Sequence, residues 1–549
     1  MKKAIAILIV LTLALTLLAA CGPGDNVVDG ERGTPGTTQT PGTTPTPGGP
    51  DVSGTAQRGG DLTLAAGSDL VFTASWMLRS TLERVQLSLV YEPLVRLDAE
   101  GNIYGFLAES IVPDYDNLTW TVTVRDNIYF SDGSQLDGEA LLWNFENFLL
   151  NSNTSDTHFG FVNRFEQTGD FTVVIHLNQW TSQIPYSLQD NAGYMFSMRA
   201  FEEHGMEWAL QNPVGTGPFV LEEAVPGEFR RYVRNENYWN PDAGPTFDSV
   251  TWLIVADEST AQAALLSGEI DGFFGPSFSM ANTLLNRGGF HVAQNTTTFT
   301  VQFLVFPSAV EGPFADIRIR QAVSYAIDSE LIVNAITYGF GIYSNQYAGP
   351  GTPFYNPNIV GYGFNPDRAR ELIAESDFAD GFSTRLYMSN QFVHMATAIS
   401  TIVQDQLRQV GIDLEVVLLE PAVWMETFRN AQDGFIIGGH GFGMNLANQM
   451  RSNFSHAAKD GVGLMSFSKL HPDDLNDIII GAVSAPDTDT MIANVMEAGR
   501  LIIDVYCLAY PVFLQPAYFA LLSERLQDNG WLNNTSLSFD YNNLHFIDN

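Results

Sequence analysis

Residues 118–136 read Leu118-Thr-Trp-Thr-Val-Thr-Val-Arg-Asp-Asn-Ile-Tyr-Phe-Ser-Asp-Gly-Ser-Gln-Leu136. The first eight alternate polar and apolar side chains and are rich in β-branched and aromatic residues, which is typical of a half-buried strand. Asp126-Asn127 and Ser131-Asp-Gly133 then punctuate the segment as turns. The stretch predicts a strand followed by a turn-rich connection, and Asp61–Gly67 predicts a second strand by the same alternation.

Helical patterns are interleaved with these strands. Residues 321–336 place apolar side chains at helical spacing, and Glu258–Ser267 forms a second such segment that stops before Gly268. Asn365-Pro-Asp367 combines a capping residue, a first-turn proline and an acid, which predicts a helix start. Because the alternation lacks a sustained βαβ rhythm, we expect an α/β chain in several lobes.

Length and charge exclude several classes of protein. The chain has 549 residues, 45% of them hydrophobic and 16% charged, so two or three packed units are expected. It has 62 acidic against 26 basic residues, for a formal net charge of −36. Nucleic-acid binding needs a basic face, so it is excluded, and long-range repulsion argues against an anionic solute.

The N-terminus has the layout of an export signal. Lys2 and Lys3 precede an uncharged apolar run from Ala4 to Ala20, and small residues lead into Cys21. This ending resembles the bacterial lipobox, in which the cysteine receives a lipid, and the alternative is one N-terminal membrane helix. Residues 22–58 contain a Pro/Thr/Gly-rich tract that predicts an extended tether between membrane and folded part.

Motifs for catalysis and for metal binding are missing from the sequence. It contains no G-x-S-x-G, H-E-x-x-H, Walker or G-x-G-x-x-G pattern, and its nine histidines are scattered. Cys21 and Cys507 allow at most one disulfide and no cysteine-based zinc site. We therefore predict a protein that is not an enzyme and that uses no cofactor or metal.

Seven segments, in order, resemble extracytoplasmic solute-binding protein family 5, the peptide, nickel and oligosaccharide group of ABC transporter receptors. They are Val90–Asp98 with Gly105–Ser110, Leu118–Leu136, Pro213–Phe219, Arg234–Asn240, Ala263–Asp271, Asp316–Asp328 and Asn365–Ile373. Any one segment is weak evidence, whereas seven in the family's order make an accidental match very improbable. In these segments the glycines of Val214-Gly-Thr-Gly-Pro218 predict a tight turn between lobes, and aromatic residues such as Trp120 and Trp239 predict core packing.

The resemblance implies a two-lobe α/β clamp of the periplasmic-binding-protein type (type II, class C-like), with a small domain inserted in the first lobe. The divisions expected from it are a signal peptide at 1–20, the lipidated cysteine and tether at 21–58, first-lobe segments at 59–95 and 213–308, the inserted domain at 96–212, the second lobe at 309–490 and a return to the first lobe at 491–549. A solute binds between the lobes, which then close, and a membrane permease receives it.

Relatives that bind peptides use an aspartate in a Gly-Trp-x-x-Asp-like stretch to pair with the ligand's ammonium group. The corresponding stretch here, Gly438–Asn448, contains no acid, which puts capture of a free N-terminus by this stretch in doubt. We expect polar, aromatic or thioether contacts to a ligand from His440, Phe442, Met444, Asn445 and Asn448. The alternative is that this glycine-rich stretch is only a tight turn.

The first-lobe side of the cleft is expected near residues 68–81. Trp76 is predicted to stack on a ligand and Arg79 to hydrogen-bond its oxygens, the alternatives being core packing and a solvated charge. Asn390 and Gln391 follow the predicted strand Thr384–Met388 and are further candidates, or else a strand-end turn.

The function expected from these residues is that of a monomeric, lipid-anchored receptor on the outer face of the cell membrane, on a Gram-positive surface rather than in a periplasm. Its partners are a peptide or peptide-like solute and the permease of an ABC importer. An oligosaccharide receptor, a nickel-chelate receptor and a surface peptide sensor without a transporter remain open alternatives, and so does a secreted hydrolase built on this scaffold.

Overall fold

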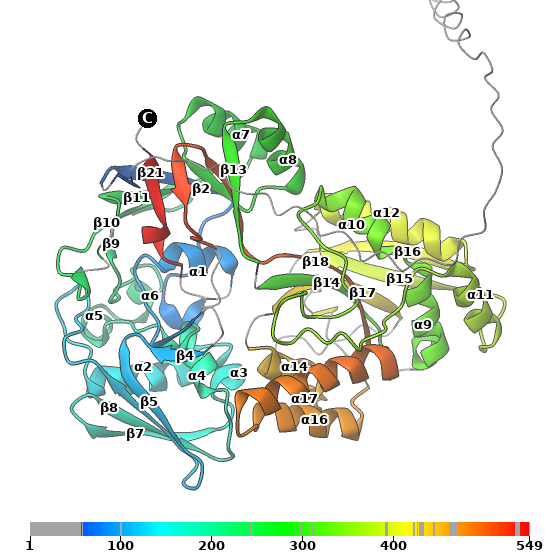
Figure 1. The fold of residues 1–549 in the computed structure, drawn as a ribbon, viewed down its shortest axis with the longest axis horizontal. Helices are drawn as coiled ribbons and strands as arrows, with labels where there is room; N and C mark the ends of the chain where they lie inside the picture. Colours follow the sequence, from blue (N-terminus) through cyan, green and yellow to red (C-terminus); the bar gives the residue numbers. More distant parts are fainter. Residues whose placement is uncertain are drawn as a thin grey trace, which may run out of the picture. The chain divides into compact units, whose positions relative to one another are not determined.

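A computed structural model describes residues 56–547 except 58, 79, 99–101, 242–243, 245, 297, 309–310, 390–392, 421–422, 425, 428–432, 443–444, 460–469 and 533–538 (Figure 1). The described part is a mixed α/β structure organised around two large sheets. We call the parts built on them the first lobe and the second lobe. Among the described residues, no helix is long and apolar enough to cross a membrane.

A seven-stranded sheet forms the centre of the first lobe. Its order is β13 (Phe290–Gln294), β19 (Phe519–Ser523), β12 (Gly272–Phe274), β2 (Asp61–Ala66), β11 (Ser249–Ile254), β10 (Phe229–Arg234) and β9 (Phe219–Val225). Strand β2 pairs in parallel with β11 and β12, and the other pairs are antiparallel. Helices α7 (Glu258–Ser267) and α8 (Phe278–Arg287) pack on β12 and β13 over a small apolar core.

Between β2 and β9 the chain forms a further, four-stranded antiparallel sheet, and we call this sheet and the elements that accompany it the inserted part. Its order is β5 (Ala108–Asp114), β6 (Thr119–Val124), β8 (Thr172–Leu177) and β7 (Val162–Gly169). The accompanying elements are β3 (Val95–Leu97), β4 (Ile103–Gly105), α1 (Thr81–Leu87), α2 (Gly138–Asn151), α3 (Ser155–Phe159), α4 (Ile184–Leu188), α5 (Met198–His204) and α6 (Met206–Ala209), with short helices η1 (Ser75–Met77) and η2 (Asn191–Gly193). One apolar core runs from Leu64 of β2 to Val122 of β6, so this part is packed continuously with the first lobe.

The second lobe is built on a five-stranded sheet. Its order is β16 (Ile412–Leu419), β15 (Phe382–Ser389), β17 (Gly434–Phe442), β14 (Phe299–Val305) and β18 (Ala509–Pro516). Its helices are α9 (Ile317–Ala326), α10 (Ser329–Thr337), α11 (Pro366–Ala374), α12 (Val393–Arg408), α14 (Leu446–Phe454), α15 (His456–Lys459), α16 (Asp473–Val483) and α17 (Thr488–Arg500), and a π-helical turn, η6, spans Leu501–Val505. A short sheet of the order β1 (Ala56–Gln57), β21 (Leu544–Ile547) and β20 (Leu526–Asp528) joins the first described strand to strands near the end of the chain.

The local predictions are confirmed, with one change. The strands at 61 and 118 are β2 and β6, α7 ends at Gly268 with a left-handed φ of 77°, and Asn365 caps α11 by accepting from the Arg368 N–H. The single helix expected over 321–336 is instead α9 and α10, separated at Ile327. The break occurs because the Asp328 side chain caps a new helix by accepting from the Leu331 N–H.

Several of the family-like segments meet at one buried carboxylate, Glu92. Its side chain accepts hydrogen bonds from the Tyr238 hydroxyl, from Trp239 Nε1 at 2.8 Å and from Thr216 Oγ1 at 3.1 Å. Burial raises the pKa of Glu92, an effect that the nearby Arg96 opposes. The segments at 90–98, 213–219 and 234–240 therefore include polar contacts that aromatic core packing alone did not predict.

The glycines of the 214–218 segment allow close backbone approach. The chain bends at residues 216–218, but neither Gly215 nor Gly217 has a left-handed φ, so the bend itself does not require glycine. A Cβ on Gly217 would lie 2.6 Å from the Val90 carbonyl carbon and oxygen, while the Gly217 N–H donates to that oxygen at 2.8 Å. The two chain segments touch so closely that only glycine fits.

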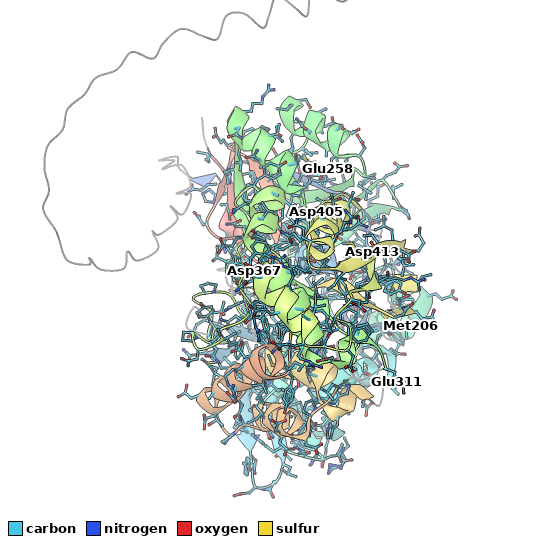
Figure 2. The ribbon with its side chains drawn as sticks, turned by 90° about the vertical axis from the view of Figure 1, so that its right-hand side faces the viewer. Met206, Glu258, Glu311, Asp367, Asp405 and Asp413 are labelled. Atoms are coloured by element: carbon cyan, nitrogen blue, oxygen red, sulfur yellow. The ribbon has the colours of Figure 1, made fainter. Side chains whose placement is uncertain are left out.

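The excess of acids is partly accounted for by exposed side chains. In Figure 2, Asp367 lies on α11, Asp405 on α12 and Asp413 on β16, and all three are exposed. Such side chains favour solubility and do not define a site.

Candidate ligand-binding site

The chain crosses between the two large sheets at two places. One crossover joins β13 to β14 and the other joins β18 to β19. The Asn295 N–H donates to the Tyr518 carbonyl at 3.0 Å, and the Ala517 N–H donates to the Thr298 carbonyl at 3.2 Å. The Asn295 amide also donates to the Leu532 carbonyl at 2.9 Å. The crossovers therefore form a paired, buried connection, which we call the hinge.

The positions of these crossovers differ from the predicted domain divisions. Strand β14 begins at Phe299 and β18 ends at Pro516, both in the second-lobe sheet, whereas the expected divisions fell at 308/309 and 490/491. The difference arises because neither β14 nor β18 carries a local mark of the sheet it joins, since strand partners are chosen by non-local pairing.

A second set of contacts joins the lobes through α3, α4, α14, α16 and α17, and we call it the seam (Figure 1). Thr181 Oγ1 and the Ser182 N–H both donate to the Val483 carbonyl, at 2.8 and 3.2 Å. Gln183 Nε2 contacts Met491 Sδ at 3.0 Å. The first two bonds supply partners for the Val483 carbonyl at the C-terminal end of α16, where a helix leaves its last carbonyl groups free.

Apolar packing reinforces the seam. Leu97 and Tyr186, from the inserted part of the first lobe, are 5% and 3% exposed and pack into the second-lobe core. Trp180 Nε1 approaches the Ala485 carbonyl at 3.4 Å. The described structure therefore has its lobes in contact both at the hinge and at the seam, the arrangement of a closed clamp.

Seven of the buried polar atoms that have no partner among the described residues lie on seam elements and on the neighbouring η2. The elements η2, α4, α3 and α14 contact one another in series. Atoms on or beside them that find no hydrogen-bond partner among the described residues are His158 Nδ1, Gln183 Oε1, Gln189 Oε1, Asn191 Oδ1, Asn445 Oδ1, Gln449 Oε1 and Arg451 Nε. We call these seven residues the interlobe polar cluster. Each such buried atom costs about 1–3 kcal/mol when left unpaired, so this concentration marks a place that a polar ligand or water would complete.

The cluster is bordered by a buried ion pair. Arg84 of α1 pairs with Asp190, and their side chains are 14% and 8% exposed. Asp190 also accepts from the Asn191 N–H at 2.6 Å as the cap of η2. Both charges are thereby compensated within the first lobe, and Asp190 has its carboxylate already engaged.

His158 is neutral in this setting. Its side chain is buried in α3, where its ring packs edge-on against Phe148 at 5.5 Å. Burial, together with the Arg84 cation, lowers the pKa of His158 to about 3. The ring therefore offers the site an uncharged imidazole.

On the second-lobe side, α14 presents a buried polar face. Asn445, Asn448 and Arg451 follow one another at a spacing of three residues and are 9%, 2% and 6% exposed. Side chains at this spacing lie on the same face of a helix. The predicted candidates Asn445 and Asn448 are thus placed beside a third residue, Arg451, that sequence reasoning did not single out.

The remaining predicted contacts on the second lobe have a mixed outcome. His440 and Phe442 lie on β17, where their backbones pair with Val301 and Phe299, and their side chains are outside the described part. Because residues 434–442 form a strand, the interpretation of this stretch as only a tight turn is wrong as far as residue 442. Met444 lies outside the described residues, as do Arg79, Asn390, Gln391 and Cys21.

Trp76 is a core residue rather than a ligand platform. It is 2% exposed and packs edge-on against Phe196, Phe201 and Trp143, with ring centroids 5.2, 5.9 and 6.2 Å away. The prediction that its ring stacks on a ligand is corrected, because first-lobe aromatic side chains surround it.

A separate surface depression, of about 440 Å³, lies on the sheet of the inserted part. Glu109, Arg125, Asp126 and Asp170 are among its lining residues. None of them belongs to the hinge, the seam or the interlobe polar cluster, so we place the candidate site at the cluster instead.

Known proteins resemble this chain in sequence and in fold. A family model, "Bacterial extracellular solute-binding proteins, family 5 Middle", matches residues 102–461. The glutathione-binding protein GsiB of Escherichia coli K12 is 30% identical over 368 residues, which cover 66% of this chain and 70% of GsiB.

Solved structures extend the likeness to nearly the whole chain. DppA of Helicobacter pylori, in complex with the peptide STSA, has a TM-score of 0.76 at 19% identity and covers 90% of this chain and 99% of its own. NikA of Brucella suis, in complex with Fe(III)-EDTA, has a TM-score of 0.76 at 19% identity, with 89% and 100% covered. These likenesses confirm the expected two-lobe binding-protein fold. The family consists of receptors rather than enzymes, as predicted. The chain belongs to the bacterial extracellular solute-binding proteins of family 5, the binding components of ABC importers.

Proposed function

We propose that this protein is a lipid-anchored receptor that captures a peptide or peptide-like solute between its lobes and delivers it to an ABC permease. The observation that carries the proposal is the interlobe polar cluster, in which five of the seven residues with an unpaired buried atom are glutamine or asparagine, three in the first lobe and two at or in α14. Amide side chains both donate and accept, and so complement the alternating N–H and C=O groups of a peptide backbone.

The positions of the acidic side chains bear on how a peptide ligand would be held. The stretch Gly438–Asn448 has no acid, and Asp190 is engaged by Arg84. We therefore expect recognition through the body of the ligand rather than through an aspartate on its ammonium group. GsiB, named as a glutathione-binding protein, makes a small modified peptide a sensible member of the test panel.

An oligosaccharide is the second candidate. Unpaired amide oxygens such as those of Gln189 and Asn191 accept hydrogen bonds from hydroxyl groups as readily as from peptide N–H groups.

Titration calorimetry on residues 52–549, which form one compact unit, separates the two candidates. The panel contains tri- and tetrapeptides, reduced glutathione, maltotriose and a nickel chelate. We expect heat from one of the peptides or from glutathione. Binding of maltotriose or of the chelate with silence from every peptide would overturn the peptide assignment.

Asn445→Ala tests the placement of the site. We expect about tenfold weaker binding, which corresponds to about 1.4 kcal/mol, because a buried amide at the start of α14 is lost. Asn286→Ala, at an exposed position of α8, is the matched control and should leave the affinity unchanged. Equal affinities of the two variants would remove α14 from the site.

A further inference from the structure

Arg451 makes a charged contact across the seam. It lies in α14 of the second lobe, and its Nη2 donates to both the carbonyl and a carboxylate oxygen of Asp156, each at 2.9 Å. Asp156 lies in α3 of the inserted part of the first lobe. The guanidinium carbon also lies 4.9 Å from the centroid of the Phe161 ring, which adds a cation–π contact with the same lobe.

The first lobe is shaped to receive this side chain. A Cβ on Gly160 would lie 2.8 Å from Arg451 Nη2, so glycine leaves room for the guanidinium. The Arg451 side chain is only 7% exposed, whereas that of Asp156 is 49% exposed. Arg451 is therefore the partner that must leave water when the contact forms, and among the described residues the groups that compensate its charge, Asp156 and Phe161, belong to the opposite lobe.

The same helix carries the candidate ligand contacts. Strand β17 bears His440 and Phe442, and α14 follows it at once with Asn445 at its cap and Asn448 in its first turn. Asn448 and Arg451 are one turn apart on the same helix face, so a movement of the first turn also moves the guanidinium. One rigid element thus connects the candidate site to the other lobe.

We infer that Arg451 is a positioning residue for lobe closure, which stabilises the closed form around the site at the start of α14 through its contacts with Asp156 and Phe161. This inference rests on the proposed function only in its use of α14 as part of the solute site. When the lobes part, the contacts to Asp156 and Phe161 are lost together, because both partners belong to the other lobe. Closure therefore gains an interaction that no solute has to supply.

The inference predicts a specific pattern of affinities. If Arg451 acts through the open–closed equilibrium, its loss lowers the closed fraction and weakens every solute by the same factor. A residue that touches the solute instead changes the ranking of solutes. The pattern across a panel therefore distinguishes positioning from direct contact.

The experiment uses the full chain with Arg451→Gln, Arg451→Lys and Asp156→Asn. We expect Arg451→Gln and Asp156→Asn to weaken every binding member of the panel about tenfold, with the ranking preserved, and Arg451→Lys to recover part of the loss. The double variant should be no weaker than Arg451→Gln, because the pair acts as a unit. X-ray scattering of the solute-free proteins should show a larger radius of gyration for both single variants than for the unsubstituted chain, because less of each variant is closed.

Matched controls and contrary outcomes keep the test decisive. Arg385→Gln removes an exposed pair with Asp433 within the second lobe and should leave affinity and scattering unchanged. Asp156→Asn changes a half-exposed side chain, so it tests the pair even if Arg451→Gln fails to fold. Unchanged affinities, or weakening of only some solutes, would overturn the inference.

Failure of the peptide assignment does not impair this test. Any solute of the panel that binds, including maltotriose or the chelate, reports closure equally well. If no solute binds, the radius of gyration of the solute-free variants tests the inference instead. Values equal to that of the unsubstituted chain would overturn it.

Discussion

At the scale of single residues, the buried polar groups are explained by their neighbours rather than by their position in the sequence. Arg320 is 2% exposed, and its guanidinium donates to the carbonyls of Phe314, Ala315, Tyr506 and Cys507. The Arg320 charge is thus stabilised by backbone carbonyls from two segments, residues 314–315 before α9 and residues 506–507 after η6. Arg451, in contrast, depends on a carboxylate from the other lobe. Two buried arginines therefore serve different purposes, one within a lobe and one between lobes.

His158 should make stability depend on pH. Its pKa is about 3 in the folded protein against an ordinary value of 6.5 for a histidine in the unfolded chain, so the unfolded chain binds more protons between these values. The free energy of unfolding therefore falls as the pH is lowered through this window, by about 1.4 kcal/mol for each unit below 6.5. His158→Phe keeps a ring against Phe148 and removes the titration. Urea unfolding at pH 7, 6 and 5 should show the unsubstituted protein losing stability relative to the variant.

The control for this prediction is His204→Asn, at an exposed position of α5. It should follow the unsubstituted protein at all three pH values. If His158→Phe also runs parallel to the unsubstituted protein, folding does not lower the pKa of His158.

At the scale of elements, close contacts between backbone segments determine where the first lobe tolerates a substitution of glycine. Gly217 donates its N–H to Val90, and Phe219 continues the pairing by donating its N–H to Leu89 at 2.9 Å before β9 proceeds. The segment is thereby tied to the chain that precedes Glu92. These backbone hydrogen bonds need the two chain segments in direct contact, with no side chain between them.

Gly217→Ala should therefore destabilise the protein. The added Cβ would meet the backbone of Leu89 and Val90, which cannot move aside as a side chain can, and we expect a loss of about 1–3 kcal/mol. Thermal or urea unfolding measures the loss. Gly67→Ala is the matched control, because a Cβ there has no heavy atom within 4 Å, and it should change stability by no more than about 0.5 kcal/mol. Equal stability of the two variants would refute the steric explanation.

At the scale of the whole molecule, the hinge and the seam join the lobes in different ways. The hinge is covalent and is stabilised by backbone pairing at Asn295 and Tyr518. Beside it Phe340, from the second lobe, lies 5.7 Å from the Phe278 ring and 5.0 Å from the Phe519 ring of the first lobe. The seam is non-covalent, and in the described part of the chain it contains hydrogen bonds, the Arg451–Asp156 ion pair and apolar packing. Opening of the clamp would therefore break the seam while the hinge keeps its connection.

The prediction that a lipid on Cys21 anchors the protein to the membrane is tested by Cys21→Ala in the producing cell. We expect the unsubstituted chain to fractionate with membranes, because a lipid on Cys21 anchors it, and the variant to lose this attachment. Cys507→Ala is the control, since that thiol is buried in the second lobe. Mass spectrometry of the N-terminal peptide should show the lipid only where Cys21 is present. Membrane retention of Cys21→Ala would favour an uncleaved N-terminal helix instead.

The sequence by itself was sufficient for the family, the two strands at 61 and 118, the helix caps at Asn365 and Gly268, and the candidacy of Asn445 and Asn448. These features depend on side-chain period, capping and short motifs, all of which act over a few residues. Only the tertiary structure decided that Trp76 belongs to the core and that the chain crosses between the two large sheets at the hinge. It also decided that Arg451 contacts Asp156, from which it is separated by 295 residues along the chain. Burial and pairing at such separations depend on how whole elements pack, and no local pattern in the chain carries that information.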